Sequence, residues 1–152
     1  MNRMTAHALL AVAWIGSVHA AATCKITGGA VAFGAYNPVS ASRLDTTGFV
    51  DAYCNQDLIV RLTLSVGNGA GASYTGGRKM TRIGSAGTLT YNLYASSSRS
   101  QVLGNDAGGS GSIQFSPRRN QTFSQPIYGS IPARQTVAAG SYADIVIATI
   151  SY

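Results

Sequence analysis

The feature that most constrains this chain is a series of short segments in which apolar and polar residues alternate. The clearest of them is LIVRLTLSV at 58–66, and GFVDAYC at 48–54 and TLTYNLY at 88–94 share its period. SIQF at 112–115 and PIYGSI at 126–131 repeat the pattern more briefly. Because successive side chains of a β-strand point to opposite faces of the sheet, a period of two predicts half-buried strands.

Turn-forming residues separate these segments, and beyond residue 20 no segment has a convincing helical period. Glycine-rich stretches occupy 67–77 and 104–112, and four prolines add further breaks. Short strands at this spacing are typical of an antiparallel sandwich. Since 152 residues are enough for one domain and no more, we predict an all-β fold in a single immunoglobulin-like domain.

The C-terminal segment GSYADIVIATISY, residues 140–152, has the pattern of a strand from the interior of a sheet. One face is expected to carry Val146, Ala148, Ile150 and Tyr152. The other face is expected to carry Asp144, Ile147, Thr149 and Ser151. A strand with apolar residues on both faces normally has a hydrogen-bonded neighbour on each side, because an open edge leaves backbone groups unpaired. No further segment follows it here, which raises the question of what lies beside it.

The first twenty residues, MNRMTAHALLAVAWIGSVHA, have the features of a secretory signal peptide. Arg3 supplies the positive start, an apolar stretch follows, and the small residues Val18 and Ala20 precede the expected cleavage site. The apolar stretch is shorter than the ~20 residues that a membrane span needs. We therefore expect 1–20 to be a cleaved signal peptide and 21–152 to be one exported domain without a membrane span.

The residue content of the exported part argues against catalysis. Both histidines and the only tryptophan lie in the first twenty residues, glutamate is absent, and the five aspartates are scattered singly. Nucleophilic catalysis, acid–base catalysis and most metal sites need imidazole, activated thiol or paired carboxylate groups. We therefore expect no enzymatic activity, no catalytic residue, no metal and no cofactor.

One glycine motif could suggest otherwise. GNGAGA at 67–72 matches the spacing of the dinucleotide-binding fingerprint and follows a predicted strand. The residues after it do not open a helix, and no acidic residue lies about twenty positions further on to hold a ribose. We interpret this segment as a loop.

Two cysteines, Cys24 and Cys54, remain in the exported part. An exported protein folds in an oxidising compartment, where a pair of cysteines is expected to form a disulfide. A reactive thiol is the alternative, but the chain offers no base to activate it. We predict a Cys24–Cys54 disulfide that ties the first strand to a strand ending at Cys54.

The basic charge and the tyrosines leave two interpretations of the surface. The net charge of +6 is dispersed, with clusters only at Arg78–Lys79–Arg82 and Arg118–Arg119, which favours solvated loop charge over an acidic-polysaccharide site. Nucleic acid is not an expected partner of an exported protein. The tyrosines in or beside strands favour packing, although exposed ones could stack on surface glycans.

Four motifs, in order, resemble the signature of the spore coat protein U domain family, which includes the pilins of archaic chaperone-usher pili. They are FGAYNP at 33–38, RKM at 78–80 leading to LTYNLY at 89–94, IYGSIP at 127–132, and the terminal GSYADIVIATISY at 140–152. Together with the cysteine pair they cover the chain from Cys24 to Tyr152.

The resemblance implies an incomplete immunoglobulin-like antiparallel sandwich that lacks its final strand. Proteins of this kind keep a hydrophobic groove open beside the C-terminal strand, and a partner inserts a strand there. A periplasmic chaperone does so first, and at the outer-membrane usher the N-terminal extension of another pilus subunit replaces it. By this resemblance Val146, Ala148, Ile150 and Tyr152 line the acceptor groove, and the strand from Cys24 forms its other wall.

One departure from the family pattern bears on the place of this subunit in a fibre. Polymerising pilins carry a donor segment of alternating apolar residues ahead of the first cysteine, whereas only Ala21, Ala22 and Thr23 lie between the expected cleavage site and Cys24. Three residues are too few for a donor strand. We therefore expect a subunit that accepts a strand without giving one, as at a fibre tip or in a coat that does not polymerise head to tail.

The function hypothesis that follows is structural. We expect a subunit of a chaperone-usher pilus or surface coat, exported through the periplasm to the cell surface or secreted, and serving adhesion and biofilm formation. The alternative hypothesis is a self-sufficient secreted carbohydrate-binding adhesive module that uses exposed tyrosines and arginines on its loops.

Overall fold

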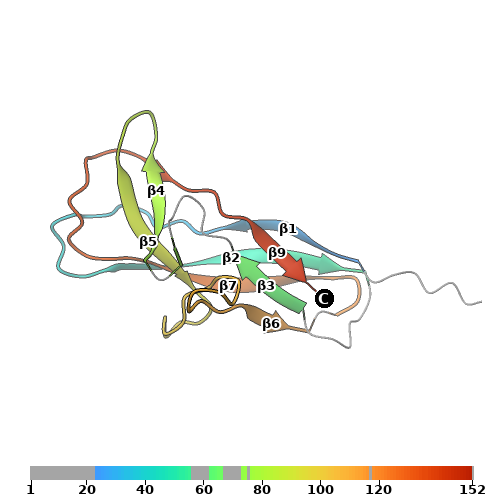
Figure 1. Cartoon of the computed structure of the whole chain (residues 1–152). Helices are drawn as coiled ribbons and strands as arrows, with labels where there is room; N and C mark the ends of the chain where they lie inside the picture. Colours follow the sequence, from blue (N-terminus) through green and yellow to red (C-terminus); the bar gives the residue numbers. More distant parts are fainter. Residues whose placement is uncertain (1–22, 56–61, 67–72, 75, 117, 152) are drawn as a thin grey trace, which may run out of the picture.

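The computed structural model describes residues 23–151 apart from 56–61, 67–72, 75 and 117 (Figure 1). Every regular element in this described part is a β-strand. The strands are β1 (Cys24–Ala30), β2 (Leu44–Cys54), β3 (Leu62–Val66), β4 (Arg78–Arg82), β5 (Thr88–Tyr94), β6 (Ile113–Phe115), β7 (Gln121–Ile131), β8 (Tyr142–Ala143) and β9 (Ala148–Ser151).

The strands form two sheets whose strand pairs are all antiparallel. The larger sheet has the order β1-β2-β7-β5-β4-β8, and the smaller one has the order β6-β3-β9. In Figure 1 the β4–β5 hairpin extends away from the long strands, while β3, β6 and β9 lie alongside them. The prediction of an all-β antiparallel fold is confirmed, and the arrangement is consistent with an immunoglobulin-like sandwich.

The ladder between β2 and β7 is the longest in the larger sheet. Its register runs without interruption from Leu44 opposite Ile131 to Cys54 opposite Gln121, which gives 11 paired residues on each strand. Both sequence segments were predicted as strands, but β7 begins five residues before the predicted start at Pro126. The apolar alternation is weak in QTFSQ, so pairing with β2 rather than local pattern sets this boundary.

The buried core lies between the two sheets. It contains Leu89, Leu93, Leu103, Ile127 and Ile131, all nearly or completely excluded from solvent. The rings of Phe115 from β6 and Phe123 from β7 stack with centroids 4.4 Å apart and join the sheets at one end. Burial of this aliphatic and aromatic surface is the main force that holds the sandwich together.

The predicted disulfide is confirmed. Cys24 opens β1 and Cys54 closes β2, and the two residues face each other in the β1–β2 register with Cα atoms 4.2 Å apart. The bond therefore fixes the start of β1 to the end of the neighbouring strand β2. Beyond Ile26 the register shifts by one residue, so a β-bulge at Thr27 separates the disulfide end of β1 from its glycine-rich end.

Two strands differ from the sequence expectation. β4 was not predicted, because its alternation places the charged Arg78 on the buried face beside Met80. The expected continuous strand from Asp144 is divided: β8 pairs with β4 in the larger sheet and β9 pairs with β3 in the smaller one. Residues 144–147 cross between the sheets and form no ladder with the described residues.

Several predictions concern residues outside the described part. These are the signal peptide at 1–20 with its boundary at residue 21, the start of the strand at 58–61, the loop interpretation of GNGAGA at 67–72, and the position of Tyr152. They stay predictions.

Candidate functional site

A large apolar groove opens between the first and the last segments of the described chain. Its volume is about 1380 Å³. It is lined on one side by the eleven consecutive residues 26–36, and on the other by residues 137–146 and Ala148. Two segments far apart in sequence thus face each other across a gap, with the core at its base.

The first wall is the outer edge of β1 and its continuation. β1 pairs with β2 on one side and has no ladder partner among the described residues on the other. After Ala30 the chain stays close to the sheet, where the Thr46 hydroxyl donates to the Ala32 carbonyl at 2.8 Å. Gly129 of β7 leaves room for the ring of Phe33, because a Cβ there would lie 2.7 Å from that ring.

The far end of this wall is fastened to the loop after β7. The Tyr36 hydroxyl donates to the carbonyl of Pro132 at 2.9 Å and accepts a hydrogen bond from the Gln135 backbone N–H at 2.8 Å. The Gln135 side chain also bonds the Thr90 backbone N–H at 2.8 Å and carbonyl at 2.8 Å. The groove therefore has a rigid end, made by two side chains that satisfy several backbone groups at once.

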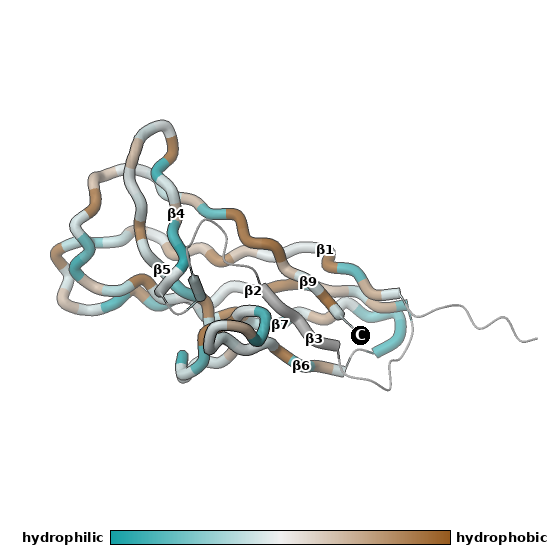
Figure 2. Tube along the Cα trace, viewed as in Figure 1, coloured by the Kyte–Doolittle hydropathy of each residue, from teal (hydrophilic) through white to brown (hydrophobic). Residues whose placement is uncertain are grey.

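The second wall is the segment that crosses between the sheets. Within it, Asp144, Val146 and Ala148 are half-buried and line the groove. Ile145 also borders the groove but is 87% exposed, and Ile147 is 75% exposed and is not part of the lining. The stretch of high hydropathy that leads into β9 marks this wall in Figure 2. Side chains of an extended segment alternate in direction, so the inward and outward sets follow from backbone geometry.

The floor of the groove is the sandwich core itself. Met80, Leu89, Leu93, Ile127 and Ile131 line the groove and are at the same time among the most buried residues. Tyr91 completes the floor, and its ring meets the ring of Phe33 edge to face with centroids 5.6 Å apart. The groove is therefore an opening into the core, which residues 26–36 and 137–148 flank without closing.

One polar contact interrupts this apolar lining. The Tyr91 hydroxyl donates to a carboxylate oxygen of Asp144 at 2.7 Å, and the backbone N–H of Ile145 donates to the other oxygen at 2.9 Å. Burial, with the neighbouring Asp144 carboxylate, raises the pKa of Tyr91 above its ordinary value, so the hydroxyl stays protonated and remains a donor. The contact connects the floor of the groove to its second wall.

A buried arginine lies under the sheet next to this contact. Arg78 is completely buried, and its guanidinium donates to the Asn92 side-chain oxygen at 2.7 Å and to the Leu103 carbonyl at 2.6 Å. It also lies over the Tyr74 ring, 5.4 Å from the centroid. Desolvation lowers the pKa of Arg78, and the nearby tyrosines and Asp144 oppose that effect. These contacts offset the cost of burying the charge.

The sequence-predicted acceptor residues are only partly brought together. Val146 and Ala148 line the groove, and their role in accepting a strand stays a prediction. Ile150 is half-buried and packs against the core, but it is not part of the groove lining. Tyr152 lies outside the described residues.

The expectation that Asp144 faces away from Val146 is wrong, because residues two apart on an extended chain share a face and Asp144 lines the groove.

Much of the groove lining was not predicted as part of a site. The sequence indicated a wall near Cys24, whereas the groove extends along residues 31–36 and 137–143. One signal was present: Val31 and Phe33 alternate with Ala32 and Gly34, so the strand pattern continues beyond β1. For the loop at 137–143 no pattern was available, since its position depends on the pairing of β8 with β4.

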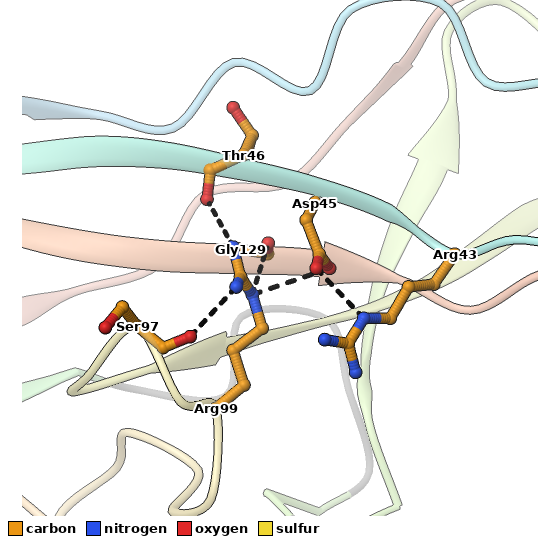
Figure 3. A network of polar contacts seen from close by, with 6 residues as sticks. All are labelled: Arg43, Asp45, Thr46, Ser97, Arg99 and Gly129. Atoms are coloured by element: carbon orange, nitrogen blue, oxygen red, sulfur yellow. Dashed lines mark hydrogen bonds and ion pairs between the residues drawn. The ribbon is translucent and has the colours of Figure 1, made fainter.

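A second polar cluster lies away from the groove. Arg99 donates to the Thr46 and Gly129 carbonyls at 3.3 Å and 3.4 Å, and it pairs with the Asp45 carboxylate at 3.4 Å (Figure 3). Arg43 donates to the same carboxylate at 2.9 Å. None of these residues lines the groove. The cluster fastens the 95–100 loop to the β2–β7 ladder and has no visible chemical role beyond that.

The described residues contain no group of three His, Cys, Asp or Glu side chains that could hold a metal ion. In the same part of the chain, no helix has the length and apolar character to cross a membrane. The site offers apolar contact surface and open backbone edges, and these suit an extended peptide.

The fold and the groove define a class: an all-β sandwich domain with one disulfide and an apolar groove open to the core. Comparison with known proteins places it more closely. The Spore Coat Protein U domain family matches residues 7–149. Protein U of Myxococcus xanthus is 32% identical over 135 residues, which cover 82% of this chain and 73% of that protein. The chain therefore belongs to the Spore Coat Protein U domain family, as its motifs suggested.

A solved structure has a similar fold. It is the CsuC–CsuE chaperone–tip adhesion subunit pre-assembly complex from the archaic chaperone-usher Csu pili of Acinetobacter baumannii. The TM-score is 0.54 at 18% sequence identity, and the match covers 87% of this chain. The chain spans only 40% of the length of the matched chain. At this identity the likeness concerns the fold.

Proposed function

We propose that this chain is an exported structural subunit of a chaperone-usher pilus or surface coat, and that a strand from a partner completes its fold. The observation that carries the proposal is the groove of about 1380 Å³, which opens into the core between two segments without a ladder partner on that side among the described residues.

The physics of an open core supports strand insertion. Each buried backbone N–H or C=O without a hydrogen bond costs about 1–3 kcal/mol, and an open sheet edge is a template for another chain. An inserted strand would pair with the edge at 144–151 or at β1, and its alternate side chains would replace water above Leu89, Leu93 and Ile127. Both gains favour an extended apolar segment over a compact ligand.

The family and the fold support the partners that we propose. The matched solved structure is described as a complex of a chaperone with a tip adhesion subunit, which supports a periplasmic chaperone as the first strand donor for this chain. An outer-membrane usher and other subunits would act later, on the way to the cell surface. Adhesion and biofilm formation, with a position at the tip or in a non-polymerising coat, belong to the same proposal.

The alternative, a self-sufficient glycan-binding module, has no specific observation in its favour. Such sites need exposed aromatic faces for sugars to stack on. Every tyrosine in the described part of the chain is buried or half-buried, and Tyr91 belongs to the core. Glycan binding by the domain with its groove empty would restore this alternative.

A pair of adjacent variants tests the proposal. A synthetic nonapeptide in which valine alternates with serine serves as the strand, and its binding to the full chain is measured by fluorescence anisotropy. Val146→Asp places a charge on the half-buried, groove-lining face, so we expect at least about tenfold weaker binding. Ile147→Asp places the same charge on a side chain that is 75% exposed, and binding should be unchanged.

Val146→Ser is a milder replacement, in case the aspartate variant does not fold. We expect it to weaken binding by several fold while circular dichroism stays that of the parent chain. Equal binding by the parent chain, the Val146 variants and the Ile147 variant would show that the peptide does not enter this groove. Absence of any binding, together with a stable and protease-resistant free chain, would contradict strand completion itself.

A further inference from the structure

The groove has a single acidic group in its lining. Of the described residues that line it, only Asp144 carries a carboxylate, and the lining contains no lysine, arginine or histidine. It stands two residues before Val146 and four before Ala148, on the same inward face. An inserted strand that contacts these two apolar residues therefore also passes Asp144.

The carboxylate is held in one orientation. Tyr91, which is 4% exposed, donates its hydroxyl proton to one oxygen, and the Ile145 backbone N–H donates to the other. Asp144 is itself half-buried, so one side of the group still meets solvent through the groove. The Tyr91 hydroxyl holds one carboxylate oxygen from the floor of the groove, and the Ile145 N–H holds the other. These two hydrogen bonds oppose rotation of the carboxylate when a strand arrives.

Strand insertion removes that remaining water. A carboxylate that loses solvent without gaining a hydrogen-bond donor is strongly disfavoured, and an oxygen can accept more than one hydrogen bond. A valine or leucine placed against Asp144 would desolvate the charge and offer nothing in return. A side chain with a hydroxyl, amide or ammonium donor would replace the lost water, and a bond to an ionised acceptor is about twice as strong as a neutral one.

We propose that Asp144 sets the register of the inserted strand by requiring a hydrogen-bond donor side chain at one inward position, where all other inward positions take apolar residues. This inference rests on the proposed strand-accepting function and adds a selection rule to it. The strand that fits has the inward pattern apolar, apolar and donor, with the donor next in line to the side chain that contacts Val146. Asp144 is thus a specificity-determining residue, and Tyr91 is the positioning residue that holds it.

The test is a valine-to-threonine scan of a strand probe. The probe is the alternating Val/Ser nonapeptide, and each valine is replaced in turn by threonine, which has nearly the same shape and adds one hydroxyl. At apolar positions the hydroxyl is buried without a partner, so binding to the full chain should weaken by about tenfold. At one position only, threonine should bind as well as valine or more tightly.

Two variants of the chain separate the role of Asp144 from general packing. Asp144→Asn keeps the shape and can still accept from Tyr91, but it has no charge, so the advantage of threonine at the exceptional position should fall several fold. Ser141→Ala, another polar residue of the lining, should leave the scan unchanged. Tyr91→Phe removes one of the two hydrogen bonds that hold the carboxylate. The advantage of threonine at the exceptional position should therefore become smaller, while valine should still bind best at the other positions.

The outcomes distinguish this inference from the function on which it rests. Peptides that bind with a uniform loss for threonine at every position would overturn the inference and leave strand acceptance intact. An exception that persists undiminished in Asp144→Asn would also overturn it, because the charge would then play no part. If no peptide of the set binds, strand acceptance fails and the inference fails with it.

Discussion

The β2–β7 ladder and the groove differ in how completely the backbone is paired. Along β2 and β7, 11 residues pair with 11 others in an uninterrupted register, and the disulfide fastens β1 to the same sheet. Across the groove, β1 and the 144–147 segment face each other without a ladder, although the core lies open between them. The first region is fully paired within the described chain, whereas we propose that the second is completed by a strand from a partner.

Substitutions in the two regions are therefore expected to have different effects on stability and on binding. Changes in the closed region should alter the free energy of unfolding and leave the groove usable. Changes to the inward face of the open region should alter binding more than stability. The four predictions below follow this division, from the largest expected effect to the smallest.

Arg78→Ala should cause the largest loss, about 3–5 kcal/mol of the free energy of unfolding. The substitution leaves a cavity under β4 and β5, and it removes the donor from the Asn92 side chain and the Leu103 carbonyl, both of which are buried. Urea denaturation measures the loss. Lys79→Ala, at an exposed neighbouring position, is the control and should change stability by less than about 0.5 kcal/mol. A similar loss in both variants would contradict the role of the buried guanidinium.

Replacing both cysteines by serine should lower the free energy of unfolding by about 3–4 kcal/mol on the chain-entropy model for a loop of this length. The sequence separation is 30 residues, and the bond holds the start of β1, which forms one wall of the groove. The variant should therefore also bind the strand peptide more weakly. Reductant should reproduce both effects in the parent chain and neither in the variant. Loss of stability without loss of binding would show that the two regions are independent.

Filling the groove should stabilise the chain by mass action. At a free peptide concentration one hundred times its Kd, the free energy of unfolding should rise by about 2.7 kcal/mol. A thermal shift series with the alternating nonapeptide measures this rise. The Val146→Ser chain should need several-fold more peptide for the same shift, since Val146 lines the groove. A peptide that binds without raising the melting temperature would be bound outside the open region.

Asp45→Asn should have the smallest effect, within about 1 kcal/mol, as expected for an exposed ion pair. Burial alone would raise the pKa of the Asp45 carboxyl, but hydrogen bonds with Ser130 and Arg43 and the charges of Arg99 and Arg43 lower it overall. A carboxyl with a lower pKa in the folded state stabilises that state above its unfolded pKa, and the contribution is lost as the pH falls through the folded pKa.

The difference between Asp45→Asn and the parent chain should therefore be present at pH 7 and smaller at about pH 2. Denaturation at the two pH values measures it. Asp51→Asn is a suitable control, because the Asp51 side chain forms no hydrogen bond or ion pair with the residues that the structure describes. An Asp45 difference that is unchanged at pH 2 would show that geometry, rather than charge, explains the effect.

A large part of the fold could be predicted from the sequence. The period of two identified β5 and β6 nearly to the residue, and it identified the 48–54 part of β2, which begins four residues earlier at Leu44. The disulfide followed from having two cysteines in an exported chain. The family followed from the resemblance of four ordered motifs and the cysteine pair, and the family match over residues 7–149 confirms it.

The candidate site could be predicted only in part. The alternation placed Val146 and Ala148 on one face of the last strand, and the family resemblance assigned that face to the groove that they line. Met80 was missed because Arg78, Lys79 and Arg82 give β4 the composition of a polar segment. Asp144 was placed on the wrong face, and the break in the last strand was not foreseen. The break arises where β8 and β9 pair with different sheets, which depends on partners distant in sequence.

The sequence by itself determined the class of this protein: an all-β, disulfide-linked domain of the Spore Coat Protein U family. These properties are local, because alternation, cysteine content and motif order can each be read along the chain. Only the tertiary structure decided where the core opens and that Tyr91 and Asp144 meet in the groove. That meeting joins residues 53 positions apart, and pairing over such a distance depends on how whole strands register, which no local pattern contains.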